Sequence, residues 1–337
     1  MRQGELTHEI IRPFVESGHI RSTTDGDLTL YSYTESCVYD RVWNPVTMAC
    51  RGLVLDSQDR IVSRPFTKFF NLGEPSCPAL PNEPYQVYEK LDGSLAIAFY
   101  HNGRWRMTTR GSFANDYVSY AERWLADFPF PKEHTVMFEV VIPNDAMSRP
   151  VKHDPGLYYL GSVHTESGMD LGPVDDGLWL QRSARCYGAE SLDVLQARAE
   201  NEVGHEGFVV RFESGLRVKI KTAWYLKLFR AITNLTEKKL RELVAETYDP
   251  EGVIASFPEE LRAEVEQIVW PLVGRAQSTG GKIYREFSML KKLYPEASSS
   301  REARKAFAFH IKEFPHRALF FKLLEGKEIM RDLILQE

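Results

Sequence analysis

One lysine, Lys90, stands where an amine could act as a nucleophile on a phosphate. It ends a run of strand-forming residues, 85–90, and the pair Asp92 and Gly93 precedes a second such run, 95–100. An Asp-Gly pair between alternating apolar runs is typical of a turn, so the sequence predicts a hairpin with Lys90 at its end. A glycine there lets a ligand approach the main chain. Taken alone, such a lysine is more often an ordinary exposed residue. Whether Lys90 is a nucleophile therefore depends on the other residues that accompany it.

Two carboxylates occur at strand positions where a glutamate needs a partner. Glu139 interrupts the apolar run 135–142, and Glu206 directly precedes the apolar run 207–210. A carboxylate in an apolar strand is costly to bury unless it pairs with a base, a ribose hydroxyl or a metal ion. The alternatives are a structural salt bridge for Glu139 and plain exposure for Glu206.

Several cations accompany these carboxylates. In the strand predicted at 217–221, alternation places Lys219 and Lys221 on one face and the apolar residues on the other. Two like charges so close repel each other unless an anion lies between them, although a solvated edge strand would show the same pattern. Neighbouring segments add further positive charge, at Arg51, Lys68 and Arg110.

Transfer of a nucleotidyl group from a nucleoside triphosphate needs these residue types. A lysine nucleophile must lose its proton, and its ordinary pKa is about 10.4. Cationic neighbours and a bound metal are expected to lower the pKa of Lys90. The carboxylates could hold Mg²⁺ directly or through its waters, and the lysine pair could neutralise the departing pyrophosphate.

Four short motifs occur in the order found in the covalent nucleotidyltransferases, which include DNA ligases, RNA ligases and capping enzymes. Residues 90–94 (KLDGS) resemble the KxDGS element of that superfamily. Residues 138–141 (FEVV), 206–210 (EGFVV) and 218–221 (VKIK) resemble its later elements. Each motif is weak alone, but four in order are a specific signal.

Three further features are similar to the phage RNA ligase 1 family in particular. They are the Arg51-Gly52 pair, the KFFN sequence at 68–71, and Tyr225 downstream of the last motif. The resemblance covers roughly residues 30 to 230.

The resemblance implies that Lys90 becomes adenylylated by ATP and that Lys219 and Lys221 assist the transfer. It implies metal binding by Glu139 and Glu206, with Mg²⁺ as the ion and Mn²⁺ as an alternative. The residues that it implies for ATP binding are Arg51, Lys68, Lys90, Gly93, Arg110, Glu139, Gly207, Lys219, Lys221 and Tyr225.

Some positions carry over less directly. Arg110 falls where the family more often has lysine, and a guanidinium is a planar fork rather than a point charge. Tyr158 and Tyr159 both fall where a residue that stacks on the base is expected. Tyr225 and Phe70 are expected to pack around the site or to belong to the core.

The predicted fold class is α+β. A nucleotidyltransferase domain built on antiparallel sheets with flanking helices is expected at residues 1–234, followed by an all-α domain at 235–337 that recognises RNA. Residues 37–39 are rich in strand formers. Separate helices are expected at 258–273 and 282–293, among other helix-like segments of the last third.

The function predicted from the resemblance is an ATP-dependent RNA ligase that joins RNA 5′-phosphate and 3′-hydroxyl ends, with cleaved tRNA as the suggested substrate. DNA ligases and capping enzymes usually follow the lysine pair with a small β-barrel, so the helical last third favours the RNA ligase type over these alternatives. A non-enzymatic RNA-binding protein would not need Glu139, Glu206 and a turn lysine. A P-loop at 278–282 fails, because Ile283 replaces the metal-binding Ser or Thr.

Composition sets the broad limits. The chain has 337 residues, 43% of them hydrophobic and 26% charged, which is ordinary for a globular protein. A net charge of -5 predicts that any polyanion site is a local basic patch. The cysteines form no CxxC pair, so neither a zinc site nor a disulfide framework is indicated, and a cytoplasmic setting of phage or bacterial type is expected. No signal peptide or membrane span is predicted.

Overall fold

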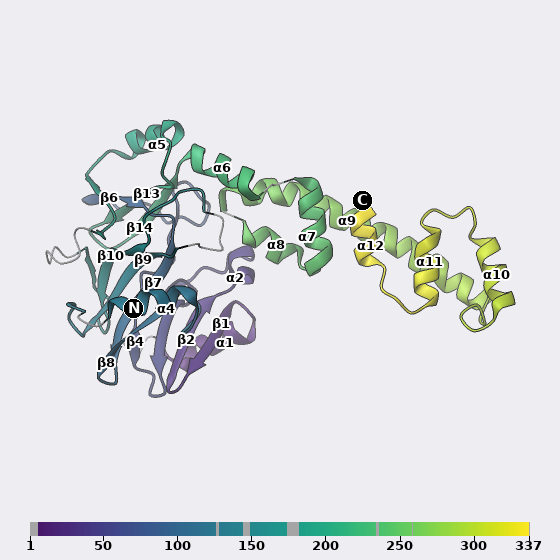
Figure 1. The fold of residues 1–337 in the computed structure, drawn as a ribbon, viewed down its shortest axis with the longest axis horizontal. Coiled ribbons are helices and arrows are strands. Elements are labelled where there is room, and N and C mark those ends of the chain that lie inside the picture. Colours follow the sequence, from purple (N-terminus) through teal and green to yellow (C-terminus); the bar gives the residue numbers. More distant parts are fainter. Residues whose placement is uncertain are drawn as a thin grey trace. The chain divides into compact units, whose positions relative to one another are not determined.

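The computed structural model describes residues 6–125, 128–143, 149–173, 182–233, 236–257 and 259–336. The chain divides into two compact units, Met1–Thr233 and Asn234–Glu337. The first unit contains three β-sheets and several helices, so its fold is of mixed α and β type with mainly antiparallel sheets (Figure 1).

The first sheet has the order β1-β2-β3-β4 and carries Arg51 at the start of β3. Helix α1 packs on it through Ile11, which is fully buried. Residues 37–39, expected as strand, instead end helix α2, because the side chain of Thr34 accepts a hydrogen bond from the backbone N–H of Cys37 and caps the helix. The elements are α1 (His8–Glu16), β1 (Ile20–Asp25), β2 (Leu28–Tyr33), α2 (Glu35–Tyr39), α3 (Pro45–Ala49), β3 (Arg51–Asp56) and β4 (Ile61–Ser63).

The second sheet has the order β11-β10-β9-β7-β8 and places Glu139 on its central strand, β9. One face of this sheet packs on helix α4 through a core that contains Phe138, Tyr159 and Val118. The elements are β7 (Ser94–His101), β8 (Arg104–Thr109), α4 (Asp116–Ala121), the 3-10 turn η1 (Glu122–Trp124), β9 (His134–Val141), β10 (Gly156–His164) and β11 (Asp170–Gly172).

The third sheet has the order β12-β6-β13-β14-β5 and carries Lys90, Lys219 and Lys221. Its apolar face, which includes Val210 and Val218, packs with Leu195 of helix α5. All strand pairs in it are antiparallel except β14 with β5. The elements are β5 (Phe70–Asn71), β6 (Tyr85–Lys90), β12 (Cys186–Gly188), α5 (Leu192–Asn201), β13 (Gly207–Phe212), β14 (Arg217–Lys221) and the following helix α6 (Ala223–Thr233).

The hairpin predicted around Lys90 is wrong. Strand β6, which Lys90 ends, pairs with β12 and β13, whereas β7 pairs with β8 and β9 in the second sheet. The turn therefore carries the chain from one sheet to another instead of reversing it. The side chain of Asp92 is only 5% exposed and accepts a hydrogen bond from the backbone N–H of Val151, so tertiary contacts direct the turn.

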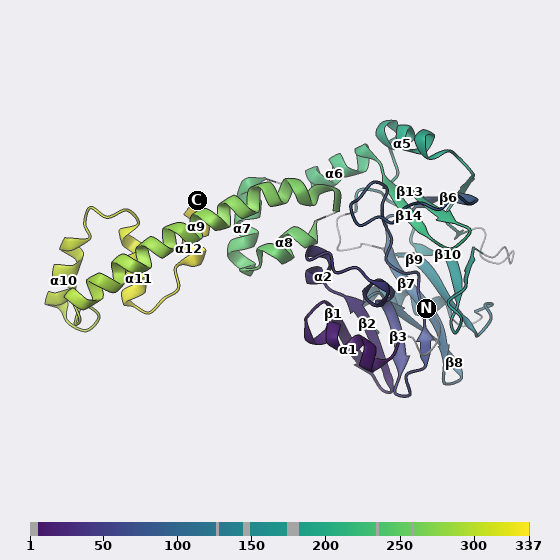
Figure 2. The ribbon, with the colours of Figure 1, turned by 180° about the vertical axis from the view of Figure 1, so that it is seen from behind.

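The second unit, in its described residues, consists of helices (Figure 2). They are α7 (Glu237–Thr247), α8 (Pro250–Ser256), α9 (Glu259–Leu293), α10 (Arg301–His310), α11 (Arg317–Leu324) and α12 (Met330–Gln336). The longest, α9, runs through the segment expected to separate two helices. Its Gly280 lies where α12 packs closely, since a Cβ there would be 3.1 Å from Cδ1 of Leu333. Residues 278–282 are thus helical, which excludes a P-loop.

None of the helices in the described ranges is both long and apolar enough to cross a membrane.

Candidate active site

Lys90 lies beside Lys221 across one intervening strand. Gly207 of β13 pairs with Lys90 of β6 on one side and with Lys221 of β14 on the other. The preceding residue, Glu206, is 5% exposed and joins the two amines. Its Oε2 is 2.7 Å from Nζ of Lys90 and its Oε1 is 3.6 Å from Nζ of Lys221. One buried carboxylate therefore holds two lysines that the sequence separates by 131 positions.

The pairing of β13 with β14 leaves no room for a side chain at Gly207. Its φ is +152°, and a Cβ there would lie 2.0 Å from the carbonyl oxygen of Ile220 and 2.8 Å from Cα of Lys221. Glycine is the residue that both the backbone angle and the contact require. The close approach expected at this glycine is thus an approach of the neighbouring strand.

The second predicted glycine, Gly93, lies directly against Glu139. A Cβ on Gly93 would be 2.6 Å from Cγ of Glu139 and 2.9 Å from the carbonyl oxygen of Val140. The turn after Lys90 is therefore packed onto the central strand of the second sheet. This contact brings Glu139 to the junction of the two sheets, beside the amine.

Burial raises the pKa of Glu139 to about 7, and the charge of Glu206 raises it too, although the nearby Lys90 favours the ionised form. A carboxyl with a pKa of about 7 exchanges a proton readily near neutral pH. The structural salt bridge considered from the sequence does not describe this residue, because its pKa is raised and not lowered.

The expectation that neighbouring cations lower the pKa of Lys90 is wrong for the protein without ligands. Burial alone would lower it, but the charges of Glu206 and Glu139, and the hydrogen bond to Glu206, outweigh burial and raise the pKa. The charged groups with the largest effect on the amine are carboxylates. Lys90 is therefore held as an ammonium ion until a ligand changes its surroundings.

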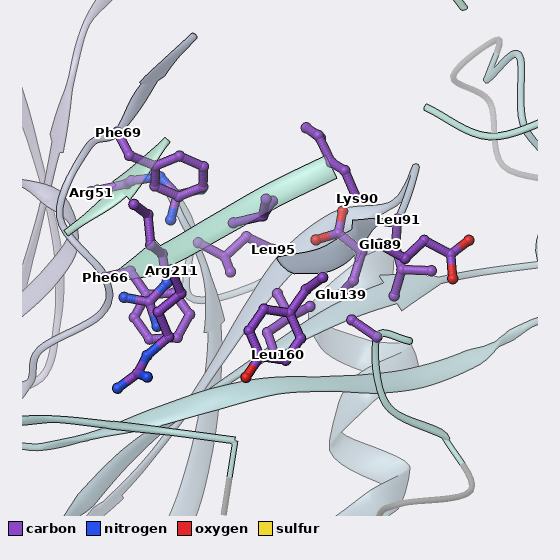
Figure 3. Close-up of a pocket in the computed structure, with 14 residues that line it drawn as sticks. Arg51, Phe66, Phe69, Glu89, Lys90, Leu91, Leu95, Glu139, Leu160 and Arg211 are labelled. Carbon is purple, nitrogen blue, oxygen red and sulfur yellow. The ribbon is translucent and has the colours of Figure 1, made fainter. Parts of the chain in front are cut away.

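A cavity opens beside Lys90 between the second and third sheets. Lys90 and Glu139 lie at one side of it, and Arg51 lies with Phe69 at another (Figure 3). Apolar side chains that could enclose a flat ring also line it. They are Leu95, Leu160 and Val209.

The tyrosines expected to stack on a base lie elsewhere. Tyr159 is 2% exposed within the core of the second sheet, and the hydroxyl of Tyr158 donates to the carbonyl of Asp154. The next residue along β10, Leu160, lines the cavity. A Gly161 bulge shifts the register of β10 against β9, which the alternation of the sequence does not reveal.

Three predicted cations gather around Tyr33 of β2. The ring of Tyr33 lies 4.9 Å from the guanidinium of Arg110. Burial raises the pKa of this tyrosine, but the charges of Arg110, Arg51 and Lys68 outweigh it and lower the pKa. Among the described residues, Nη1 of Arg51 is buried without a hydrogen-bond partner. Such a cluster suits an anion with several charges.

Lys68 and Phe70 hold this cluster together. The Nζ of Lys68, a residue only 5% exposed, lies 4.3 Å from the ring centre of Phe70 and 3.1 Å from the carbonyl oxygen of Phe69, to which it donates. Phe70 itself is 2% exposed. Phe70 therefore packs next to the site and also belongs to the core, the two positions expected for it from the sequence.

The remaining predicted residues lie on the same side of the third sheet. Lys219 pairs with Val209, which lines the cavity, and it lies on the same face of β14 as Lys221. Strand β14 is flanked by β13 and β5, so the edge-strand alternative is excluded. The ring centre of Tyr225, on α6, lies 5.3 Å from Nζ of Lys221. The hydroxyl of Tyr225 donates a hydrogen bond to Asp92 at 3.5 Å.

Sequence reasoning missed Tyr33, Leu160 and Arg149. Tyr33 is one of fifteen tyrosines and lies in an ordinary strand. Arg149 belongs to no strand or helix, and its contacts with the Lys90 turn appear only in the fold. No signal in a single sequence distinguishes these residues from their neighbours.

Metal binding by the carboxylates stays a prediction. Among the described residues, no group of three or more His, Cys, Asp or Glu side chains is arranged to hold an ion. The charges of Glu206 and Glu139 both raise the pKa of Lys90, so both carboxylates act on this amine.

Comparison with known proteins agrees with this arrangement. Residues 49–167 match a family model described as RNA ligase. The chain is 26% identical to an RNA ligase from Rhodothermus phage RM378, over 90% of this chain and 86% of that protein. It is 29% identical to RNA ligase 1 of bacteriophage TS2126, over 80% of this chain and 69% of that one.

The chain is thus similar in sequence to phage RNA ligases.

Six of the predicted site residues lie within the range of the family model. They are Arg51, Lys68, Lys90, Gly93, Arg110 and Glu139. Among solved structures, an archaeal ATP-dependent RNA ligase is similar with a TM-score of 0.49 and 15% identity, over 95% of this chain and 96% of that one.

Proposed function

We propose that this RNA ligase uses ATP to join RNA 5′-phosphate and 3′-hydroxyl ends through a lysyl-AMP on Lys90. The observation that carries the proposal is the half-buried amine of Lys90, which lies 2.7 Å from the buried carboxylate of Glu206 and lines a cavity together with Glu139 and Arg51. Relatives that are named RNA ligases support the joining of RNA.

The first step is attack of Nζ of Lys90 on the α-phosphorus of ATP. The nitrogen–phosphorus bond forms, the bond to the bridging oxygen breaks, and pyrophosphate leaves. Lys90 must first lose its proton. Glu206 is within hydrogen-bond distance, and Glu139, with a pKa of about 7, is matched to accept a proton near neutral pH.

Two groups of cations would contact different phosphates of ATP. Lys219 and Lys221, on the strand beside Lys90, would neutralise the reacting phosphate. Arg51, Lys68 and Arg110, gathered at Tyr33, would hold the β- and γ-phosphates. In the second step an RNA 5′-phosphate oxygen attacks the lysyl-AMP phosphorus and breaks the nitrogen–phosphorus bond. In the third, an RNA 3′-hydroxyl attacks the activated 5′-phosphorus and AMP leaves.

The donor set fits a divalent ion that is carried in with the triphosphate. Mg²⁺ is usually held by one or two carboxylates together with substrate phosphates and waters, and Glu139 and Glu206 supply two carboxylates. Glu206 is bonded to two lysines, so Glu139 would hold Mg²⁺ or Mn²⁺ more directly. When bound, the ion would neutralise phosphate charge.

The second unit, taken as the helical domain at 235–337, would recognise the RNA, with cleaved tRNA as the suggested substrate. Exposed lysine pairs on its helices support a role in holding a phosphate backbone. They are Lys238 and Lys239 of α7 and Lys291 and Lys292 of α9.

Incubation with ATP labelled at the α-phosphate tests the first step. The wild-type protein should retain label after denaturation, and Lys90→Ala should retain none. Lys305→Ala, which removes an exposed lysine of α10, is the matched control and should label normally. Equal labelling of Lys90→Ala would exclude Lys90 as the site. Sealing assays on matched RNA and DNA ends, with ATP or GTP, then separate an RNA ligase from a DNA ligase or a capping enzyme.

A further inference from the structure

We infer that Arg149 is a positioning residue for the reaction, which clamps the turn after Lys90 and so fixes Lys90 relative to Glu139. The inference rests on the proposed function of Lys90. Arg149 does not line the cavity beside Lys90 and is not in any of the four sequence motifs.

Arg149 grips three consecutive residues of the turn with one guanidinium. Its Nη1 donates to the carbonyl of Gly93 and lies 3.4 Å from Oδ1 of Asp92. Its Nη2 donates to Oγ of Ser94 at 2.7 Å. The side chain is 11% exposed, so these bonds are shielded from water. The two terminal nitrogens thus determine the path of the chain from β6 to β7.

Two more contacts from the same short segment hold the turn. The backbone N–H of Val151 donates to Oδ2 of Asp92 at 3.2 Å, and the backbone N–H of Asp92 donates to Nε2 of His153 at 3.2 Å. Residues 149–153 therefore brace residues 92–94, and Tyr225 adds a hydrogen bond from its hydroxyl to the same Asp92.

The position of the turn at residues 92–94 affects the chemistry because this turn contacts Glu139. Gly93 packs directly against Cγ of Glu139, and Ser94 pairs with Val140 in the second sheet. Lys90, four residues before Ser94, pairs with Gly207 in the third. Arg149 therefore controls the junction at which the amine from one sheet meets the carboxylate from the other. A displacement of about 1 Å at such a junction can cost about 100-fold in rate.

Only a guanidinium has this geometry. Nη1 and Nη2 lie in one rigid plane and reach a carbonyl and a hydroxyl at once, whereas a lysine at this position would keep the charge but supply a single point donor. A purely electrostatic role predicts that lysine substitutes for arginine. A positioning role predicts that it does not.

Single-turnover formation of the lysyl-nucleotide, measured over a range of ATP concentrations, tests the inference. We expect Arg149→Ala to lower the maximal rate about 100-fold while the ATP concentration at half-maximal rate changes less than about threefold, since the residue touches the turn and not the nucleotide. Arg149→Lys should be nearly as slow, and added guanidinium ion should partly restore Arg149→Ala. Lys152→Ala, which removes an exposed charge from the same segment, should react normally.

Each result bears on a separate claim. A wild-type protein that takes no label overturns the proposed function and this inference together. A labelled wild type with an equally fast Arg149→Ala, or an Arg149→Lys that recovers the full rate, overturns only the role of Arg149. If Arg149→Ala unfolds at the assay temperature, Ser94→Ala removes one acceptor of the clamp, and an unchanged rate in that variant overturns the inference.

Discussion

Glu139→Gln should stabilise the protein increasingly as the pH rises. The pKa of Glu139 in the folded chain is about 7, against its ordinary value of 4.5. A group whose pKa is raised by folding favours the folded state at low pH, and that contribution is lost as the pH rises through the folded pKa. Ionised Glu139 therefore destabilises the fold, and a neutral glutamine of the same shape removes this cost.

The magnitude follows from the two pKa values. At about 1.4 kcal/mol for each unit of pKa, ionised Glu139 costs about 3.5 kcal/mol once the pH is well above 7. At pH 5.5 the folded protein keeps the proton, and the cost falls to about 1.5 kcal/mol. The free energy of unfolding of Glu139→Gln, minus that of the wild type, should thus grow by about 2 kcal/mol between pH 5.5 and pH 8.5.

Urea unfolding at the two pH values, followed by tryptophan fluorescence, measures this difference. Trp43, Trp105, Trp124, Trp179 and Trp224 all belong to the first unit, and one further tryptophan belongs to the second. Glu213→Gln, an exposed position of the first unit, is the control and should give a difference that does not change with pH. A difference that stays flat or shrinks as the pH rises for Glu139→Gln would refute the reasoning. The same variant should form lysyl-AMP far more slowly, because Glu139 lies beside Lys90.

Three other outcomes follow from the site. Gly207→Ala places a Cβ 2.0 Å from the carbonyl oxygen of Ile220 at a φ of +152°, so it should cost about 3 kcal/mol or more of stability and abolish labelling. Gly274→Ala, in open space on α9, should instead raise stability by up to about 1 kcal/mol and leave labelling unchanged. Glu206→Gln should lower the pKa of Lys90, because it removes the largest charge that raises it, so the rate of lysyl-AMP formation should begin to rise at a lower pH; a pH–rate profile whose rise stays in place would count against this. Changing both Lys291 and Lys292 to Glu should weaken RNA binding and reduce its dependence on salt without slowing lysyl-AMP formation, and gel shifts at several salt concentrations would test this.

The sequence by itself determined which face of a strand each charge occupies. Alternation correctly placed Lys219 and Lys221 on one face of β14 and Val218 in the core, because the period of a strand is a local property of the backbone. The apolar run around Glu139 likewise predicted that the residues beside this carboxylate are buried. The motif order around Lys90 was enough to indicate the similarity to RNA ligases that the comparisons then found.

Only the tertiary structure decided what those charges meet. Strand partners are chosen by packing between distant segments, so the sequence could not show that the turn after Lys90 joins two sheets rather than closing a hairpin. The same applies to Arg149, whose partners lie more than fifty residues away. The pKa of Lys90 rises rather than falls because the fold brings Glu206 and Glu139 near the amine, and charge interactions depend on distance in space, not on separation along the chain.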